Sequence, residues 1–362
     1  MAVDSYCFMK GLILSGGKGT RLRPLTYTGA KQLVPVANKP VLFYALEDLV
    51  EAGVTEIGIV ISPETGEQVR HETGDGSRFG ARITYILQAQ PLGIAHAIKI
   101  AHDFIGADPF ILFLGDNFIR GGIVPQVDAF RAQALDAQII LYEMPDPSSM
   151  GVAVLDADGR VQRVVEKPKQ FISPYAVIGI YMFGPSVFEA VNQIQPSARG
   201  ELEITDTIQY LVNKGLNVRA HKLADAWVDT GRMGDMLEAN RLVLDVMPGK
   251  IEGSVEDSLL EGRVILEAGA RVIHSKIRGP AIIGKNTLVE NAFVGPYTAI
   301  HHDCIVRNCE IEHSIVLENS QLENVGTRVA DSLIGRNVCI QRAEGPAKTV
   351  HLMLGDFSQV GI

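Results

Sequence analysis

The pattern of apolar and polar positions changes once along the chain. Up to about Pro248, short apolar runs alternate with segments of helical spacing. This alternation predicts βαβ units and a mostly parallel sheet. The runs expected as strands are Lys10–Leu14, Glu56–Ile61, Arg82–Leu87, Phe110–Leu114 and Gln138–Glu143, and the expected helices are Val41–Ala52, Ile94–Phe104 and Val124–Ala134.

Beyond Pro248, apolar residues recur every six positions. A period of six fits neither a strand nor a helix, but it is typical of a parallel β-helix, in which each coil turns one branched residue inward on each flat side. A plain antiparallel sheet is the alternative. One series is Leu288, Val294, Ile300 and Val306, and a second is Val316, Leu322, Ile334 and Ile340, with Arg328 as its polar exception. We therefore expect two domains, 9–248 and 249–362, with 343–362 an irregular tail packed on the β-helix or a neighbour.

The amino-acid composition limits the kinds of partner and the cellular compartment expected for the chain. The chain has 362 residues, of which 46% are hydrophobic, and its formal net charge is -9. An acidic balance argues against a nucleic-acid partner. No apolar run approaches the roughly 18 residues of a membrane span, and Met1–Phe8, to which we assign no function, lacks signal-peptide features. We expect no membrane partner and a cytoplasmic location. The cysteines form no disulfide framework, and Cys304 and Cys309 are expected as buried free thiols.

A glycine-rich turn follows the first expected strand. It reads Ser15-Gly16-Gly17-Lys18-Gly19-Thr20-Arg21, and its glycines would let backbone N–H groups approach phosphate oxygens. The spacing matches neither a Walker A loop nor a dinucleotide fingerprint. Between Gly16 and Pro40 the chain carries Lys18, Arg21, Arg23, Lys31 and Lys39 without one carboxylate. This stretch is either a solvated basic loop or a cradle for a polyphosphate leaving group.

Acidic residues stand where a metal ion would be needed. Asp116 and Asn117 follow the apolar run Phe110–Leu114, and Asp229 lies in Trp227-Val228-Asp229-Thr230-Gly231. Magnesium prefers carboxylate oxygens and keeps several waters, so one or two aspartates suffice. Each aspartate alone would more often be a helix cap or a turn residue.

Two further motifs are polar. Lys167 ends an apolar run after Glu166 and precedes Pro168, so an extended backbone is expected there. A polar loop, Ser197–Asp206, leads to a helix for which Thr205 or Asp206 is the expected cap.

Taken in order, GGKGTRLRPLT, KQLVPVANKP, LGDN, EKP, ARGELEITD and WVDTG resemble the motifs of the sugar-1-phosphate nucleotidylyltransferases over nearly all of 9–342. The hexapeptide region resembles the long form of this family. The resemblance implies a Rossmann-like, mixed, mostly parallel sheet followed by a left-handed parallel β-helix. It also implies transfer of a thymidylyl group from dTTP to glucose 1-phosphate, with Mg²⁺ as cofactor and pyrophosphate as the second product.

The resemblance assigns roles residue by residue. The nucleotide-binding set is Gly16, Gly17, Gly19, Thr20, Arg21, Gln32, Gln88, Gly93 and Asp116. The sugar-phosphate set is Asn117, Gly151, Glu166, Lys167 and Val177. Magnesium would be held by Asp116 and Asp229, with Trp227 beside the metal loop, and the catalytic residues would be Arg21, Lys31, Asp116 and Lys167. No histidine or cysteine constellation offers a general base, and none is needed, because a phosphate monoester with a second pKa of about 6 is largely dianionic at neutral pH.

Several alternatives stay open. The short form carries an acidic residue at the position of Leu92 and a tyrosine at that of Met150, so UTP or an amino-sugar phosphate remain possible substrates. Hexapeptide β-helices also occur in acyltransferases, for which His301 and His302 would be the candidate bases. A non-catalytic regulatory subunit is the third alternative. The β-helix itself favours assembly into a homo-oligomer.

Overall fold

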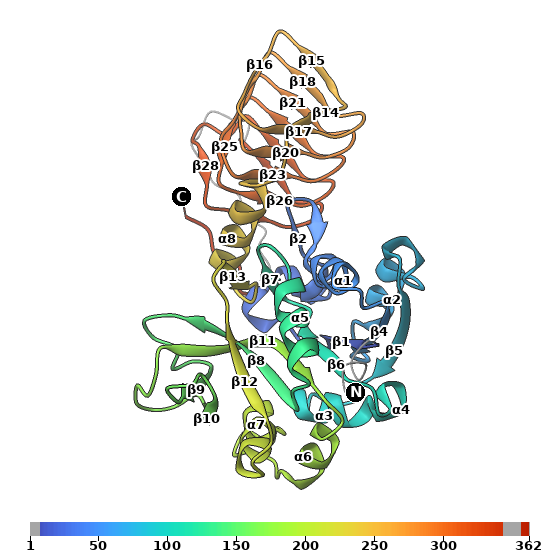
Figure 1. Cartoon of the computed structure of the whole chain (residues 1–362). Coiled ribbons are helices and arrows are strands. Elements are labelled where there is room, and N and C mark those ends of the chain that lie inside the picture. The colour runs from blue at the N-terminus through green and yellow to red at the C-terminus, as the bar shows by residue number, and fades with distance from the viewer. Residues whose placement is uncertain (1–7, 343–355, 362) are drawn as a thin grey trace. The chain divides into compact units, whose positions relative to one another are not determined.

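The computed structural model describes residues 8–342 and 356–361, in two compact units (Figure 1). The first unit comprises the chain up to Lys18 together with Leu42–Trp227, and the second comprises Gly19–Val41 together with the chain from Val228. The second unit is therefore discontinuous: an early loop belongs with the late β-helix. The predicted domain limits, 9–248 and 249–362, stay a prediction.

The first unit is built on a nine-stranded mixed sheet. Its main path runs β10-β9-β11-β6-β1-β4-β5, and β8 joins β11 to β12. Strands β6, β1, β4 and β5 are parallel, with β5 at the edge of the sheet, whereas β11 is antiparallel to β6. The strands are β1 (Lys10–Ser15), β4 (Glu56–Ile61), β5 (Arg82–Leu87), β6 (Phe110–Leu114), β8 (Ala137–Glu143), β9 (Gly151–Leu155), β10 (Val161–Glu166), β11 (Tyr175–Phe183) and β12 (Val218–Lys222).

Helices supply the apolar surface that buries this sheet. Helices α3, α6 and α7 contact one another and pack their buried residues into one cluster with the strands (Figure 1). Strand β1 is buried along nearly its whole length, as expected for a central parallel strand covered by helices. The helices are α1 (Val41–Glu51), α2 (Gly66–Thr73), α3 (Ile94–Ile100), α4 (His102–Ile105), α5 (Val124–Gln133), α6 (Val187–Gln193) and α7 (Ile204–Asn213). The expected helix Ile94–Phe104 is thus interrupted at Ala101.

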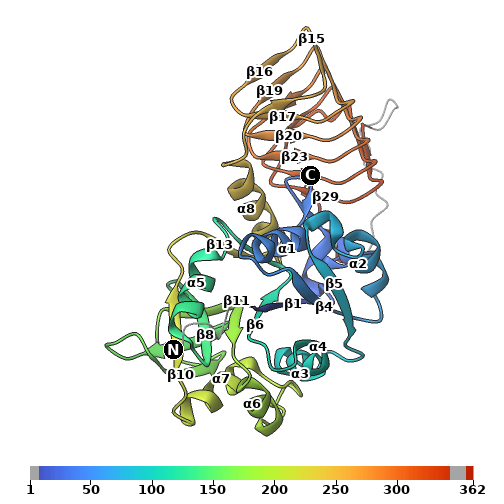
Figure 2. The ribbon, with the colours of Figure 1, turned by 45° about the vertical axis from the view of Figure 1, so that its right-hand side comes forward.

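The second unit contains helix α8 (Met233–Leu244), a short β2–β3 hairpin (Pro35–Val36 and Lys39–Pro40) and a parallel β-helix (Figure 2). The β-helix has three parallel sheets. The first sheet is β14 (Lys250–Ile251), β17 (Val264–Leu266), β20 (Ala281–Ile283), β23 (Thr298–Ile300), β26 (Ile315–Val316) and β29 (Leu333–Ile334). The second is β15 (Ser254–Glu256), β18 (Arg271–Ile273), β21 (Leu288–Glu290), β24 (Ile305–Arg307), β27 (Gln321–Glu323) and β30 (Cys339–Gln341). The third is β16 (Leu259–Glu261), β19 (Lys276–Arg278), β22 (Phe293–Val294), β25 (Glu310–Glu312) and β28 (Val329–Ala330).

The coil length of the β-helix departs from three strict hexapeptides. Val272 lies directly beside Val289, and Val289 beside Val306, so these coils advance by 17 residues. In these coils one side is a residue short, and the inward position shifts by one. Later coils differ: the step is 16 residues from Ala299 to Ile315 and 18 from Ile311 to Val329. Leu288, taken from the six-residue spacing as inward, is only half-buried, whereas Val289 is fully buried. Likewise the inward residue beside the polar exception Arg328 is Val329, which packs against the β-helix core.

The architecture confirms the predicted fold class: a mixed-sheet α/β unit and a parallel β-helix. The β-helix core also contains two of the cysteines, Cys304 and Cys309, as buried free thiols. Burial raises the pKa of both thiols to about 11. Cys339 is exposed and free, whereas Cys7, the rest of 1–7 and most of the tail expected over 343–362 lie outside the described residues.

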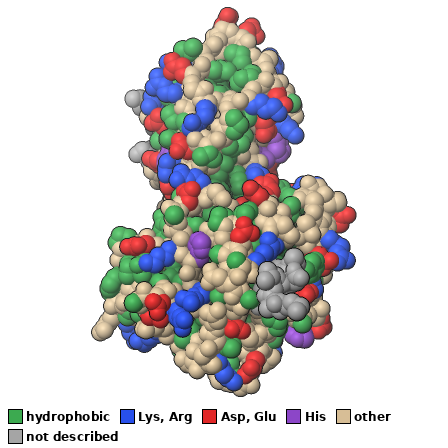
Figure 3. Space-filling view, viewed as in Figure 1, with side chains coloured by type: hydrophobic (Ala, Val, Ile, Leu, Met, Phe, Trp, Pro, Cys, Tyr) green, Lys and Arg blue, Asp and Glu red, His purple; other side chains and the backbone are tan. Residues whose placement is uncertain are grey.

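Neither unit contains a helix of the length and apolarity that a bilayer crossing requires, within the residues that the structure describes. On the face drawn in Figure 3, acidic and basic side chains are interspersed.

Candidate active site

The first unit carries the beginning of the glycine-rich loop at the carboxyl end of β1. Ser15 ends the strand and is fully buried, and Gly16 follows it. A Cβ at Gly16 would lie 3.6 Å from Oε1 of Gln88, so the amide of Gln88 packs against the loop backbone. Both residues line a small hollow of about 10 Å³ with Lys18, room for about one water.

Gln88 is held in place by its surroundings. Its Nε2 lies 3.0 Å from Nδ1 of His96 and donates to the carbonyl of Gly93 at 3.3 Å. Gly93 has φ 102°, and an added Cβ there would collide with the backbone of Leu202. Partial burial, together with Lys99, lowers the pKa of His96, which favours the neutral ring that can accept from Gln88. His96 was missed from the sequence, because a lone histidine on a helix gives no distinctive signal.

Asp116 and Asn117 follow strand β6 and are both buried. Oδ1 of Asn117 accepts from the indole Nε1 of Trp227 at 2.7 Å and from the backbone of Gly179 at 3.3 Å. Its amide in turn lies 3.4 Å from Oδ1 of Asp116. Gly179 leaves the necessary room, because a Cβ there would come within 2.8 Å of Asn117 Oδ1. Trp227 therefore fixes the side chain next to Asp116.

Three predicted sugar-phosphate residues meet on neighbouring strands. Glu166 of β10 lies opposite Gly151 of β9, and Gly151 lies opposite Val177 of β11. A Cβ on Gly151 would lie 2.8 Å from Cγ2 of Thr205 and 3.5 Å from Oε2 of Glu166. Hence the sheet register, which the sequence does not display, brings these residues together around a glycine that has no space for a side chain.

Lys167 corrects one expectation. Its φ is 43°, in the left-handed region, so the extended backbone expected before Pro168 is wrong. The backbone N–H of Lys167 donates to the carbonyl of Met150 at 2.9 Å, which holds this turn. The exposed ammonium lies 3.5 Å from Oε1 of Glu166. The strand therefore ends at Glu166, and Lys167 begins the turn that follows it.

Arg199 joins this cluster, although the sequence analysis gave it no role. Its guanidinium contacts Glu203 at 2.8 Å, Glu166 at 3.1 Å and Glu201 at 3.6 Å. The bonds to Glu203 raise the pKa of Arg199, which stays cationic. Glu166 thus has a cation on either side. The motif ARGELEITD contained the signal, but its internal pairing i to i+4 became visible only in three dimensions.

The cap expected at Thr205 or Asp206 is also corrected. Helix α7 begins at Ile204 and its N-cap is Glu203, which makes no side-chain cap bond. The side chain of Glu203 is instead held by Arg199, and the hydroxyl of Thr205 donates to Oε2 of Glu166 at 3.4 Å. Helix α7 therefore supports the Glu166 carboxylate from its first turn.

The second unit carries the rest of the glycine-rich loop. Gly19 has φ 60°, and a Cβ there would lie 2.8 Å from Cβ of Lys31, which makes glycine necessary at this turn. The hydroxyl of Thr26 donates to the carbonyl of Gly19 at 2.7 Å. Thr20 and Arg21 follow in a short 3-10 turn and are exposed. The loop is thus closed on itself with its basic end facing solvent.

Arg21 and Asp229 lie together in this unit. Nη2 of Arg21 is 3.8 Å from Oδ2 of Asp229. Gly231 permits the approach, because a Cβ there would lie 2.7 Å from Nη2 of Arg21 and 3.2 Å from Oδ1 of Asp229. Residues predicted to bind phosphate and metal are therefore neighbours in the fold, although about 200 positions separate them in the sequence.

The same loop is anchored to helix α8 and to the β-helix. Asn240, fully buried, accepts from the backbone of Ala37 at 2.9 Å and donates to the carbonyl of Tyr297 at 2.9 Å. The amide of Asn38 donates to the carbonyl of Ile300 at 2.9 Å. Gln32, predicted to contact the nucleoside, is buried in the same segment. The β-helix therefore contributes directly to the position of this loop.

The donor chemistry fits a hard divalent cation. Asp116 offers a buried carboxylate beside an oriented amide, and Asp229 offers a second carboxylate. Among the described residues, three or more acidic, histidine or cysteine side chains nowhere gather in a metal-binding group. Two carboxylates suffice for an ion that takes few protein ligands and keeps several waters. Because the two aspartates belong to different units, their joint action stays a prediction.

Comparison with known proteins defines the class. Residues 10–246 match the family described as Nucleotidyl transferase, and the chain belongs to this family. It is 48% identical to a glucose-1-phosphate thymidylyltransferase of Streptomyces griseus over 355 residues, which are 98% of this chain and 99% of the relative. It is 47% identical to the enzyme of the same name from Streptomyces antibioticus over 356 residues, covering 98% and 99%. These two similarities include the β-helix.

Two solved structures each resemble about two thirds of the chain. A Bacillus anthracis protein crystallised with a sucrose is 37% identical and has a TM-score of 0.62, covering 67% of this chain and 98% of its own. A UDP-glucose pyrophosphorylase complexed with UDP-glucose has a TM-score of 0.60 at 24% identity, covering 66% and 100%, which supports the fold alone.

Proposed function

We propose that this chain is a glucose-1-phosphate thymidylyltransferase, which converts dTTP and glucose 1-phosphate to dTDP-glucose and pyrophosphate. The observation that carries the proposal is the similarity, at 48% and 47% identity over nearly the full length, to two relatives of that name. The meeting of Gly151, Glu166 and Val177 on adjacent strands supports a sugar-phosphate pocket in the first unit. The Arg21 loop of the second unit supports triphosphate binding.

In the proposed reaction, a phosphate oxygen of the sugar phosphate attacks the α-phosphorus of dTTP. The new P–O bond forms as the bond to the β-phosphate oxygen breaks, and pyrophosphate leaves with the electron pair. The nucleophile is already dianionic, so no residue has to remove a proton. The chain's task is to bring two anions together and to hold them in line.

The cationic side chains have distinct tasks in this proposal. Lys167 offsets the charge of the attacking phosphate as a compact ammonium, and Arg21 and Lys31 offset that of the triphosphate. Glu166, flanked by Lys167 and Arg199, accepts hydroxyl groups of the sugar. Asp116 and Asp229 would hold Mg²⁺, which supplies charge neutralisation on the phosphates when bound.

The competing functions make different use of the same residues. An acyltransferase would need an available histidine base. The His301 side chain is only 18% exposed, whereas that of His302 is 42% exposed, so His302 is the candidate left for that function. Nothing in the fold favours UTP or an amino-sugar phosphate over the proposed substrates. A regulatory subunit would have no need for the Gly151 cradle or for the Arg199 network.

The deciding experiment follows pyrophosphate release by the purified chain with Mg²⁺ and glucose 1-phosphate, offering each nucleoside triphosphate in turn. We expect dTTP to be used far better than UTP, CTP, ATP or GTP, and chelation of the metal to stop turnover. A preference for UTP would move the substrate but keep the chemistry. Absence of release with every nucleotide and every sugar phosphate tried would refute the proposal in favour of the regulatory subunit.

A further inference from the structure

The side-chain amide of Gln88 has one orientation that satisfies its neighbours. Its Nε2 lies 3.3 Å from the carbonyl oxygen of Gly93 and 3.0 Å from Nδ1 of His96. A backbone carbonyl oxygen can only accept a hydrogen bond, so the nitrogen of the amide, and not its oxygen, must face Gly93. The backbone of Gly93 therefore decides which way round the amide stands.

This orientation in turn decides the protonation of His96. The amide nitrogen of Gln88 can only donate, so Nδ1 of His96 must accept and carries no proton. The imidazole is then neutral, with its one proton on its own Nε2. A proton on Nδ1 would set two N–H groups against each other.

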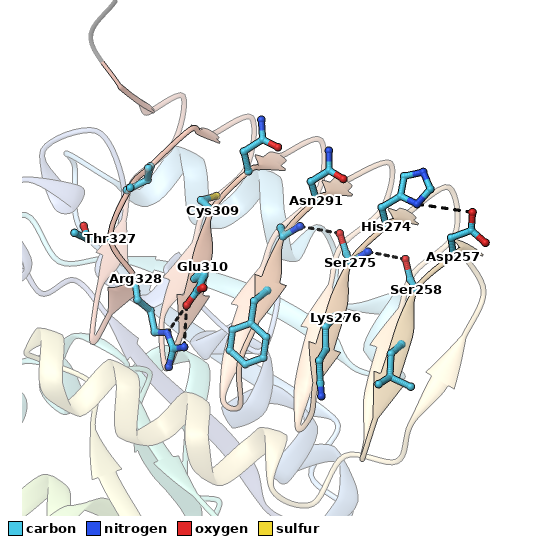
Figure 4. A pocket seen from close by; sticks show the side chains of 16 residues that line it. Asp257, Ser258, His274, Ser275, Lys276, Asn291, Cys309, Glu310, Thr327 and Arg328 are labelled. Atoms are coloured by element: carbon cyan, nitrogen blue, oxygen red, sulfur yellow. Dashed lines mark hydrogen bonds and ion pairs between the residues drawn. The ribbon is translucent and has the colours of Figure 1, made fainter.

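The charges near His96 favour the neutral ring. His274 of the β-helix offers a contrast, because it lies 3.8 Å from Asp257, a carboxylate that can pair with a protonated ring (Figure 4). The charged neighbour of His96 is instead a cation, Lys99. Partial burial lowers the pKa of His96, and Lys99 lowers it further. The ring can therefore act as an acceptor at neutral pH.

The other end of the Gln88 amide is left to face the glycine-rich loop. Its Oε1 would lie 3.6 Å from a Cβ at Gly16, and Gln88 lines the hollow of about 10 Å³ together with Gly16 and Lys18. Both N–H groups of the amide are directed elsewhere, one at Gly93 and one at His96. At this hollow, Gln88 therefore presents an acceptor.

We propose that His96 is a positioning residue for base selection: it accepts from Gln88 and so holds Oε1 toward the base of the nucleotide. This inference rests on the proposed function, in which Gln88 contacts the base. Thymine and uracil carry an N–H at ring nitrogen N3, which can donate to Oε1. Cytosine has a lone pair at N3, which would face the lone pairs of Oε1. The site should thus take thymine or uracil and reject cytosine.

His96 supplies one of the two contacts that keep the amide from turning over. The other contact is long, at 3.3 Å, and the carbonyl of Gly93 also accepts from the backbone N–H of Ala97 at 3.3 Å. A reversed amide would offer its N–H groups to the lone pair of cytosine. A hydrogen-bonding site rejects a mismatched ligand because polar groups would be left unpaired, and an amide that turns over avoids that penalty. Loss of His96 should therefore relax the selection.

Two replacements of similar size test this role on the full-length chain. The side-chain oxygen of asparagine can accept from Gln88 near the place of Nδ1, whereas leucine cannot. We expect His96→Leu to lower the preference for dTTP over dCTP, as the ratio of kcat/KM in pyrophosphate release, by about tenfold. His96→Asn should keep that ratio within about threefold of the wild type. His71→Leu, at an exposed histidine of helix α2, is the control and should leave the ratio unchanged.

A role of His96 in packing alone would give another result, because dTTP and dCTP would then be used less well to the same extent. The KM for glucose 1-phosphate should change little in either His96 variant, and thermal unfolding reports whether each variant is folded. Equal loss of the dTTP preference in both folded variants, or no loss in His96→Leu, would overturn the proposal. Continued use of dUTP, which keeps the N–H at N3, would support it, and rejection of dUTP together with dCTP by the wild type would count against it.

Combining substitutions measures whether His96 acts through Gln88. In the background Gln88→Ala, the preference for dTTP over dCTP should already be low, and His96→Leu should lower it no further, because residues that act as one unit are not additive. A second loss of similar size in the double variant would show that His96 acts by another route.

The protonation of His96 can be measured without turnover. Nuclear magnetic resonance of protein with isotopically labelled histidine distinguishes the two ring nitrogens, and the signal that His96→Asn removes belongs to His96. We expect an unprotonated Nδ1 and a protonated Nε2 at neutral pH, and a proton on Nδ1 would overturn the inference.

The same measurements separate failure of this inference from failure of the proposed function. A wild type that uses dTTP and dCTP equally well would keep the nucleotidylyl transfer but overturn base selection by Gln88. A wild type that releases pyrophosphate with no nucleotide would refute the proposed function. Calorimetric binding of dTTP and dCTP to the same variants would then decide the inference: it stands if His96→Leu, but not His96→Asn, loses the preference for dTTP.

Discussion

The mixed sheet and the β-helix position their polar side chains by different rules. In the sheet, Gly151, Glu166 and Val177 come from three strands and meet through a strand register that no sequence pattern indicates. In the earlier coils of the β-helix, residues 17 positions apart lie side by side, so Lys276 is followed by Phe293 and then Glu310 along one line. In a repetitive fold, the neighbours of a surface residue can therefore be predicted from the sequence. In the pocket they cannot, because it is formed by long-range strand pairing that does not repeat.

Replacing the predicted metal ligands should have the largest effect and should separate the two regions. We expect the double variant Asp116→Asn with Asp229→Asn to lose magnesium-dependent pyrophosphate release, because amides do not neutralise the cation. The same chemical change at two exposed β-helix aspartates, Asp303→Asn with Asp331→Asn, should leave the rate unchanged. Full activity of the first pair with Mg²⁺ would refute the ligand assignment.

Lys167 is expected to come next. Lys167→Ala removes the cation beside Glu166 and should lower kcat and raise the KM for glucose 1-phosphate, at a cost of roughly 3–4 kcal/mol in the transition state. Lys169→Ala, two residues on and also exposed, is the matched control and should behave as wild type. Initial rates at varied glucose 1-phosphate measure both constants. Ordinary kinetics in the Lys167 variant would remove this residue from the mechanism.

Replacing one glycine in each region compares how much space the two regions leave for an added side chain. Gly151→Ala introduces a Cβ 2.8 Å from Thr205, which should displace helix α7, destabilise the fold by roughly 1–3 kcal/mol and weaken sugar-phosphate binding. Gly326→Ala in the β-helix meets nothing within 4 Å and should be close to neutral. Chemical denaturation and the KM for glucose 1-phosphate check both variants. If Gly151→Ala were as mild as Gly326→Ala, the proposed pocket would be roomier than the sheet register implies.

The smallest effect tests the 17-residue coil. Val289→Ala removes two buried methyl groups from the β-helix core and should cost about 1.5 kcal/mol of unfolding free energy. Leu288→Ala, on the neighbouring half-buried position, should cost less although leucine is larger. Equilibrium unfolding in urea compares the two. If Leu288→Ala lost more unfolding free energy than Val289→Ala, Leu288 would be the inward residue, as the strict six-residue spacing predicts.

The sequence predicted the elements better than their contacts. The short apolar runs predicted strands β4, β5 and β6 with their observed limits. Strands β4 and β6 are buried and have continuous apolar runs, whereas β5 lies at the edge of the sheet and is partly exposed. The family motifs supplied the candidate residues, and the structure brings Glu166, Gly151 and Val177 together. The roles of Arg199 and His96 were not visible, since each depends on partners set by tertiary packing. Lys167 was misjudged for the same reason: a backbone bond to Met150 outweighs the local preference of a residue before proline.

Asn240 of helix α8 links three parts of the chain that lie far apart in the sequence. It ties the backbone of Ala37, in the early loop, to that of Tyr297, in the β-helix. We therefore expect the two segments to change together in evolution. A chimaera that takes its β-helix from a relative would lack the early loop that fits this β-helix. Second-site mutations that compensate for a damaged early loop should therefore be found in the β-helix. Among relatives, sequence changes in the loop should accompany changes in the coils that it contacts.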